Sequence, residues 1–220
     1  MHKRYLEVRR LGRVGYEDAL ALQKVLETKV ISGREYNYLL LLEHPHTFTL
    51  GRRAGNNGVL ASAEMLRKIG ADVFETNRGG RVTYHGIGQV VGYPIVNLSP
   101  GREDVHRYVR DLEEVLIRTM ADFGIEAFRV EGLTGAHTVE GKIAAIGVHI
   151  KRWVTTHGFA LNVNTDLSYY NWIIACEGEP VTSMERLLGR ELDMPEVEDR
   201  IESNFREVFE YQLIPEKVYI

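Results

Sequence analysis

Residues 78–89 read Arg-Gly-Gly-Arg-Val-Thr-Tyr-His-Gly-Ile-Gly-Gln, with glycine pairs on both sides of a short β-branched and aromatic run. Glycine lets a backbone turn tightly or approach a bound group, because no Cβ blocks it. The run between the glycines is typical of a strand, whose period of two divides it between Arg81, Thr83 and His85 on one face and Val82 and Tyr84 on the other. The stretch is either a glycine-kinked hairpin at a sheet bend or the wall of a pocket. Its polar side chains, packed between flexible backbone points, favour the pocket wall.

The flanking sequence predicts a mixture of helices and strands. Apolar spacing predicts helices at residues 16–31, 61–69 and 104–124, and a last one that begins near Asp193. Short apolar runs predict strands at residues 4–11, 38–42, 47–51, 72–76, 90–96, 125–130, 142–150 and 154–164. Because consecutive strands occur at 81–97 and 142–164, we expect an α+β fold rather than strict βαβ alternation. The expected architecture is a mixed, mostly antiparallel sheet with helices packed on one side.

The bulk composition is that of a globular protein. The chain has 220 residues, of which 44% are hydrophobic and 26% charged, so we expect one domain over residues 1–220, although the length leaves room for a second, small one. A net charge of −4 argues against general nucleic-acid binding, which usually needs a basic face. No apolar run approaches the roughly 20 residues of a membrane helix, and the N-terminus lacks the apolar core of a signal peptide. We therefore expect a cytoplasmic protein without a membrane partner.

Two kinds of ligand site lack their sequence signals. The glycine-rich stretch is not Gly-x-Gly-x-x-Gly at a strand-to-helix junction, and no Walker-type Gly-Lys-Ser/Thr occurs, so no nucleotide fingerprint is present. His44 and His46 are the only close pair of histidines, and no second cysteine exists to complete a zinc site. We predict no metal and no cofactor.

Cys176 is the single cysteine, which excludes an internal disulfide and suits reducing surroundings. It follows an apolar run and precedes a polar turn. A lone cysteine is either a small buried hydrophobe or a reachable nucleophile. A free thiol has a pKa of about 8.5, so a nucleophilic cysteine needs a positive group or a base beside it. The carboxylates of Glu177 and Glu179 would instead raise the pKa of the thiol if they stood close to the sulfur.

Three residues are candidate partners for this thiol. His85 and His157 each follow strand-like sequence and precede a glycine. Lys142 opens an otherwise apolar strand. It is either a lysine that snorkels at a strand end or a buried ammonium that stabilises a thiolate and later serves as a base.

Three motifs together resemble one family. They are residues 78–95, residues 141–147 and residues 157–162, and the shorter stretches 41–45 and 181–183 agree with them. In this order they resemble the octanoyltransferases of lipoate biosynthesis, within the biotin/lipoate protein ligase superfamily. One departure is that the family usually has Pro-Cys-Gly where this chain has Ala175-Cys176-Glu177.

The resemblance implies a biotin/lipoate ligase-like catalytic domain and a set of site residues. Cys176 would carry the octanoyl group as a thioester, and Lys142 would lower the thiol pKa and shuttle protons. The acyl-binding segments would be Arg78, Gly79, Gly80, Arg81, Val82, Thr83, Tyr84 and His85, then Ala145, Ile146 and Gly147, and then Gly158, Phe159 and Ala160. The implied donor is octanoyl-acyl carrier protein. The implied acceptors are lipoyl domains of 2-oxoacid dehydrogenases or the glycine cleavage H protein.

This chemistry agrees with the glycine motifs of the chain and with its lack of a nucleotide-binding motif. Transfer between two thioesters needs no ATP, and the oxyanion can be held by backbone N–H groups near 79–80, 147 or 176–178. Val82, Tyr84, Ile146 and Phe159 are the candidates to line the acyl chain. Arg52, Arg53, Arg78 and Arg81 are either contacts for an acidic carrier protein or solvated surface.

Three other functions fit some of the same residues. One is an ATP-dependent lipoate or biotin ligase, although the longer glycine run expected around an adenylate is missing. Another is a non-catalytic module that binds carrier protein, which the altered residues beside Cys176 would permit. The last is a thiol hydrolase that pairs Cys176 with His85 or His157.

Overall fold

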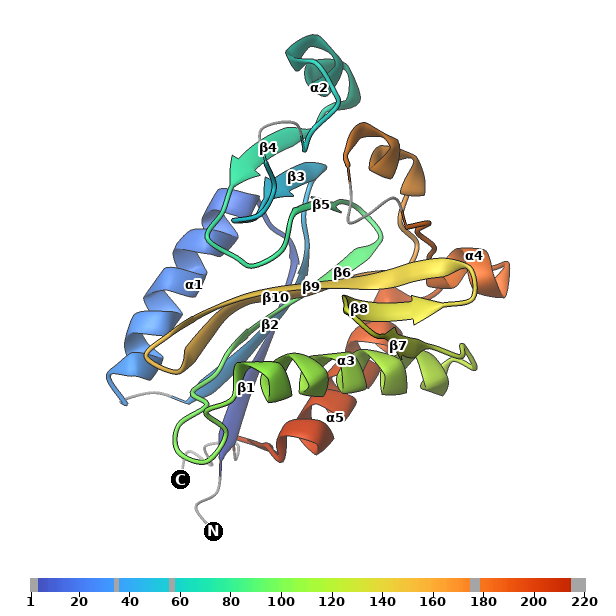
Figure 1. Ribbon diagram of the computed structural model, residues 1–220. Coiled ribbons are helices and arrows are strands. Elements are labelled where there is room, and N and C mark those ends of the chain that lie inside the picture. Colours follow the sequence, from blue (N-terminus) through green and yellow to red (C-terminus); the bar gives the residue numbers. More distant parts are fainter. Residues whose placement is uncertain (1–3, 34–35, 56–57, 175–178, 215–220) are drawn as a thin grey trace.

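The computed structural model describes residues 4–33, 36–55, 58–174 and 179–214 (Figure 1). Within them the strands form a sheet of eight, in the order β11-β1-β2-β6-β10-β9-β8-β7, and a sheet of three, in the order β4-β3-β5. The strands of the large sheet are β1 Tyr5–Arg13, β2 Asn37–Glu43, β6 Gln89–Ile95, β7 Phe128–Val130, β8 Leu133–Thr138, β9 Gly141–Lys151, β10 Val154–Asn162 and β11 Gln212–Leu213. Within the large sheet only β1 pairs in parallel, with β2 and β11, so the predicted mixed and mostly antiparallel sheet is confirmed.

The small sheet explains the glycine-rich stretch. Its strands are β3 Thr47–Leu50, β4 Asp72–Glu75 and β5 Val82–His85, and β3 pairs antiparallel with β5. β5 and β6 lie in different sheets, so the hairpin interpretation of residues 78–89 is wrong. The chain crosses between the sheets at Gly86 and Gly88, where Gly88 has φ +77° and a Cβ on Gly86 would collide with the Tyr84 hydroxyl.

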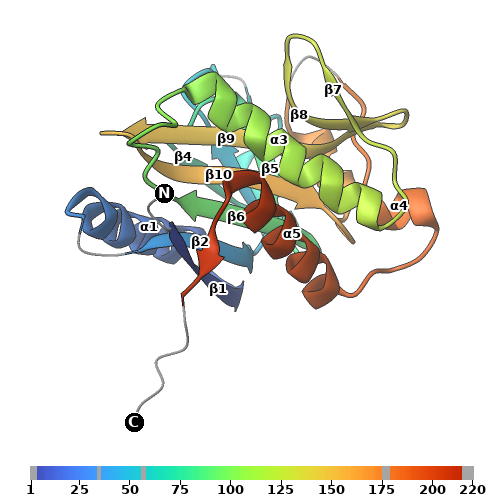
Figure 2. The same cartoon turned by 90° about the horizontal axis from the view of Figure 1, so that it is seen from below.

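Helices cover both faces of the large sheet. They are α1 Tyr16–Ile31, α2 Ala63–Ile69, α3 Val105–Asp122, α4 Met184–Leu188 and α5 Met194–Phe209, with a 3₁₀ turn η1 Leu167–Trp172. Figure 2 shows α3 and α5 on one side and α1 on the other. The expectation of helices on one side only is therefore wrong.

The cause lies in β2, which is apolar on both faces. Leu39 and Leu41 belong to the core beneath α3 and α5, whereas Leu40 and Leu42 belong to the core beneath α1. A strand without polar positions can be buried on both sides, and a second helical layer removes its other face from water. No helix in the described part of the chain is long and apolar enough to cross a membrane.

A third, small core supports β5 from behind. It contains Phe48, Ala71, Val82, Tyr84 and Ile173, with Tyr169, Tyr170 and Trp172 of η1 packed against it. The Tyr84 and Tyr169 rings stack with centroids 4.9 Å apart. This packing fixes the plane of β5 and thereby places Thr83 and His85 on the opposite face.

Candidate active site

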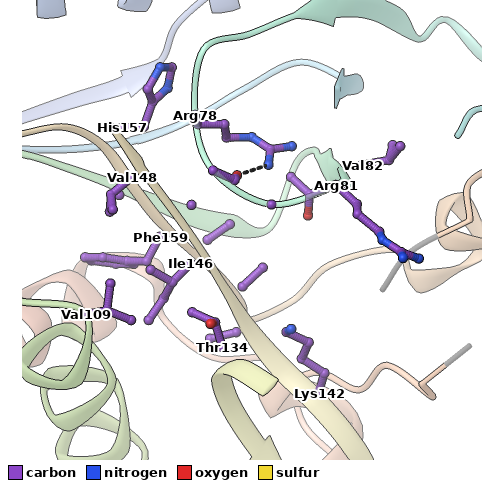
Figure 3. Close-up of a pocket in the computed structure, with 18 of the residues that line it drawn as sticks. Arg78, Arg81, Val82, Val109, Thr134, Lys142, Ile146, Val148, His157 and Phe159 are labelled. Carbon is purple, nitrogen blue, oxygen red and sulfur yellow. Dashed lines mark hydrogen bonds between the residues drawn. The ribbon is translucent and has the colours of Figure 1, made fainter. Parts of the chain in front are cut away.

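A cavity of about 470 Å³ follows β9 and β10 beneath the glycine-rich loop (Figure 3). It brings together nearly all of the residues that the sequence selects: Arg78, Gly79, Gly80, Arg81, Val82, Thr83, His85, Lys142, Ala145, Ile146, Gly147, Gly158, Phe159 and Ala160. Segments far apart in sequence therefore form one continuous wall.

Two predicted site residues are not among the lining residues. Tyr84 points the other way: its ring is fully buried in the core behind β5 and its hydroxyl lies 2.7 Å from His46 Nδ1. Cys176, with Ala175 and Glu177, lies outside the described residues. The chain on either side is described, and Ile174 N donates to Gly58 O over 2.9 Å.

Arg78 anchors the loop over the cavity. Its side chain is only 7% exposed and donates to Thr49 O, Thr49 Oγ1 and Gly79 O. The interpretation of Arg78 as solvated surface is therefore wrong, since the guanidinium serves as a buried fastening between β3 and the loop. Arg52, Arg53 and Arg81 are exposed and line the rim of the cavity.

Gly147 allows the loop to rest on β9. Gly79 N donates to Val148 O over 2.9 Å, so this amide is already used. A Cβ on Gly147 would lie 2.9 Å from Gly79 O and 3.1 Å from Arg78 Cδ. Only glycine fits this approach without displacing backbone, which explains the Gly147 of the Ala-Ala-Ile-Gly motif.

The middle of the cavity is apolar. Val109 of α3, Ile146 of β9 and Phe159 of β10 lie together there (Figure 3). The Phe159 ring lies across Gly92 of β6, where a Cβ would overlap its atoms. These side chains form a slot suited to an aliphatic chain.

One end of the cavity contains histidines. His85 Nδ1 lies 2.9 Å from Gln89 Oε1, and its Nε2 lies 3.4 Å from Thr49 Oγ1. His157 Nε2 lies 2.7 Å from Asn77 Oδ1. Burial holds the pKa of His85 well below its usual range and lowers the pKa of His157 to about 4. Both rings are therefore neutral at physiological pH.

The other end contains Lys142. His157 is the strand partner of Val148, which lies six positions after Lys142 on β9, a span of about 20 Å at the rise of a strand. The stem of Lys142 crosses Gly135 of β8, since its Cε lies 2.9 Å from the place of a Cβ there. Figure 3 shows the amine directed into the cavity.

The chain that follows Cys176 in sequence is fastened to Lys142. Lys142 N donates to Pro180 O over 2.8 Å, and Thr182 N donates to Lys142 O over 3.0 Å. Pro180 stands four residues after Cys176. The described chain thus returns to Lys142, and not to His85 or His157, directly after the segment that contains the thiol.

A hydrogen-bond network joins the motifs 78–95 and 157–162 to the stretch 181–183. Gln89 Nε2 and Tyr170 Oη donate to Asn162 Oδ1, and Asn162 Nδ2 donates to Thr182 O. Sequence reasoning did not assign roles to these residues. The available signal was that Gln89 and Asn162 are amide side chains beside the apolar residues of their strands.

Other residues at the site were also missed. Val109 was recognised only as part of a helical stripe, and Glu179 only as a neighbour of the cysteine. His137 and Thr134 carried no signal, because no strand was predicted over residues 133–138. Among the described residues no group of three or more His, Asp, Glu or Cys side chains is placed to hold a metal ion.

Comparison with known families matches this architecture. Residues 15–206 match the family described as "Lipoyl protein ligase A/B catalytic domain", and the chain belongs to that family. An "Octanoyltransferase" of Solibacter usitatus is 49% identical, with 94% of both chains covered. An "Octanoyltransferase" of Rubrobacter xylanophilus is 50% identical, covering 92% of this chain and 93% of the relative. The resemblance carried by the three motifs is thereby confirmed.

Solved structures confirm the fold class. A putative lipoate protein ligase from T. acidophilum with bound lipoic acid superimposes with a TM-score of 0.73, covering 97% of this chain and 88% of that one. The two chains are 14% identical, so this likeness concerns the fold alone.

Proposed function

We propose that the chain is an octanoyltransferase that accepts an octanoyl group from acyl carrier protein on Cys176 and passes it to a lysine of a lipoyl domain. One observation carries this proposal beyond the names of the relatives. Lys142 projects into an apolar cavity at the point where the chain that follows Cys176 is bonded to the Lys142 backbone.

In the first half-reaction the Cys176 thiolate attacks the carbonyl carbon of the donor thioester. A new C–S bond forms and the bond to the carrier sulfur breaks, so the carrier leaves as a thiol after it receives a proton. A positive Lys142 beside the sulfur favours the thiolate and supplies that proton. The two thioesters have similar energies, so this step requires no ATP.

In the second half-reaction the acceptor lysine attacks the Cys176 thioester. Its nitrogen must be uncharged to attack, and neutral Lys142 accepts the proton that the new amide loses. A C–N bond forms, the C–S bond breaks, and the Cys176 thiolate is restored together with a protonated Lys142. The histidines are poorly suited to this task, because both ring nitrogens of His85 and Nε2 of His157 already have partners, and both rings lie at the other end of the cavity.

The apolar slot accounts for the acyl group. An octanoyl tail buries about six methylenes, and at ~0.8 kcal/mol each this gives roughly 5 kcal/mol at most. Ile146, Phe159 and Val109 supply the apolar surface. The buried Arg78 and Gly79 form the roof, fastened to β3 and β9.

The exposed rim supports a role for the partners. Arg52, Arg53 and Arg81 line the mouth and are exposed, and they would meet an acidic carrier protein. For the acceptor we propose a lipoyl domain of a 2-oxoacid dehydrogenase or the glycine cleavage H protein.

Intact-protein mass spectrometry after mixing with octanoyl carrier protein tests the proposal. We expect one octanoyl adduct on Cys176, absent from Cys176→Ala, which disappears when a lipoyl domain is added. Full turnover with Cys176 unmodified would refute the proposal. Adenylate formation that depends on ATP would identify a ligase instead, and binding without transfer would identify a carrier-protein module.

A further inference from the structure

Two side chains beside Lys142 have no role in the proposed chemistry so far. His137 of β8 is the strand partner of Lys142 of β9, and the register shifts between Ala136 and His137. Opposite residues of an antiparallel pair present their side chains on one face, and such irregularities re-aim side chains near active sites. His137 is only 3% exposed, so it forms part of the packed surroundings of the lysine.

Glu179 reaches the same place from the chain after Cys176. Its neighbour Pro180 accepts the Lys142 N–H, which holds the backbone of Glu179 against β9. The Glu179 side chain lines the cavity together with Lys142, and its Oε1 lies 3.8 Å from His137 Nδ1. The side chain is 20% exposed, so its charge is only partly screened by water.

Both side chains contain a buried polar atom without a hydrogen-bond partner. Among the described residues neither Glu179 Oε2 nor His137 Nε2 has one. Buried polar atoms in native proteins are nearly always paired, and exceptions occur where a group has a chemical task. The carboxylate oxygen therefore has capacity for a further donor on the cavity side.

His137 does not neutralise this carboxylate. Burial lowers the pKa of His137, and the Lys142 ammonium lowers it further, against the opposing effect of the Glu179 and Glu113 carboxylates. The ring is thus neutral at physiological pH, and a neutral ring at 3.8 Å is a weak partner for a carboxylate.

The other carboxylate that faces His137 is already occupied. Glu113 of α3 binds Arg110 and Arg129 through Oε2, at 2.8 and 3.2 Å, and its Oε1 accepts Gly135 N. Its charge is balanced by those two arginines. Glu179 differs, because it lines the same cavity as the Lys142 side chain and the backbone beside it is bonded to the strand of that lysine.

We propose that Glu179 is a positioning residue for Lys142, whose carboxylate draws the lysine side chain toward it and sets the pH at which that side chain gives up a proton. The inference rests on the proposed function, in which Lys142 must alternate between charged and neutral forms. A carboxylate nearby favours the charged form. It therefore keeps the proton available for the departing carrier thiol and delays the neutral form that the acceptor requires.

The test is the pH dependence of discharge from a preformed octanoyl–Cys176 thioester to a lipoyl domain, in single turnovers. Glu179→Gln keeps the shape and removes the charge. In a plot of the discharge rate against pH, the rate rises as the lysine becomes neutral, and we call this part of the profile the rising limb. We expect the rising limb of Glu179→Gln to move to lower pH by about one unit. Glu179→Asp, which restores the charge, should move the limb back toward that of the unmodified protein.

Glu140→Gln is the matched control. Glu140 is an exposed carboxylate at the turn between β8 and β9 that pairs with Arg186, so the variant removes the same charge without touching the cavity. Its limb should coincide with that of the unmodified protein. A Glu179→Gln profile lowered equally at every pH, with its limb unmoved, would overturn the inference and show a structural role only.

The two proposals fail in different ways. If the unmodified protein forms no octanoyl thioester, the proposed function is wrong before any variant is compared. If it forms and discharges the thioester but Glu179→Gln has the same limb, only the role of Glu179 is wrong.

Discussion

Both ends of the cavity contain buried polar side chains, but the two ends differ in how fully these side chains are hydrogen-bonded. At the histidine end, both ring nitrogens of His85 lie near polar partners, as do those of His44, which packs against the His85 ring behind the cavity, and His157 uses its Nε2. At the lysine end, His137 Nε2 and Glu179 Oε2 have no partner among the described residues.

The contrast indicates a structural role for the polar residues at the histidine end and a chemical role for those at the lysine end. Buried polar groups that are fully paired hold a fold together, whereas unpaired ones near a cation keep their capacity for protons and substrate. His157 Nδ1 is the exception at the histidine end, since it too lacks a partner among the described residues. The comparison predicts that changes at the lysine end alter rates and that changes at the histidine end alter stability.

The largest expected effect is that of Lys142→Arg. Arginine retains a positive charge for the thiolate but cannot give up its proton, so acylation of Cys176 should persist while discharge to the lipoyl domain falls about 10²–10⁴-fold. Single-turnover measurements separate the two steps. Lys151→Arg, at the exposed end of the same strand, is the control. Discharge from Lys142→Arg at an undiminished rate would show that Lys142 does not transfer the proton.

The second prediction concerns stability at the histidine end. Burial lowers the pKa of His44 and of His157 to about 4, below the usual value of about 6.5 that an unfolded chain would have. As pH falls from 6.5 toward 4, these histidines become protonated in the unfolded state but stay neutral in the folded state. The free energy of unfolding therefore decreases. The loss approaches about 3 kcal/mol for each ring by linkage.

Urea denaturation at a series of pH values measures this loss. In His44→Gln one titrating ring is removed, so the dependence on pH should become shallower by about 1.4 kcal/mol per pH unit in the middle of the range. Equal slopes for the two proteins would show that His44 does not contribute in this way.

The third prediction concerns the wall between the two ends. Gly147→Ala places a Cβ 2.9 Å from Gly79 O and should cost about 1–3 kcal/mol of stability as the loop shifts. Gly79→Ala is the matched variant on the facing backbone. Its Cβ would lie 3.5 Å from Val148 O, an ordinary contact, so it should be tolerated. Equal losses in the two variants would contradict the close approach at Gly147.

The smallest expected effect lies at the rim. Reversing Arg52 and Arg53 to Glu should raise KM for the carrier protein about three- to tenfold at low salt, and less at high salt. Lys24→Glu on exposed α1 is the control for net charge. An unchanged KM at low salt would leave these arginines as solvated surface.

Much of the fold could be predicted from the sequence, because periodicity was strong where burial was one-sided. The helix at 16–31 and the strands around residues 38–42 and 90–96 lie where expected. The second helical layer was missed because the sequence of a wholly apolar strand such as β2 does not indicate which element packs on each of its faces. The strand β8 was missed because Leu133–Thr138 has a bulge and a glycine.

The candidate site was predicted where glycines and polar residues share a motif. Gly147 and Gly158 carried a signal because close backbone approach requires them. Tyr84 was placed on the wrong wall by its family segment, although the strand period had already put it opposite Thr83. His137 and Glu179 could not be found, because their meeting depends on a strand register and a loop path that no local pattern encodes.

A crystal structure of the free enzyme would test the central claim most directly, through the distance from Cys176 Sγ to Lys142 Nζ. The account predicts a separation of about 4 Å or less, short enough for the ammonium to stabilise the thiolate. A sulfur that instead lies against His85 or His157, or on the far side of the sheet from Lys142, would contradict it.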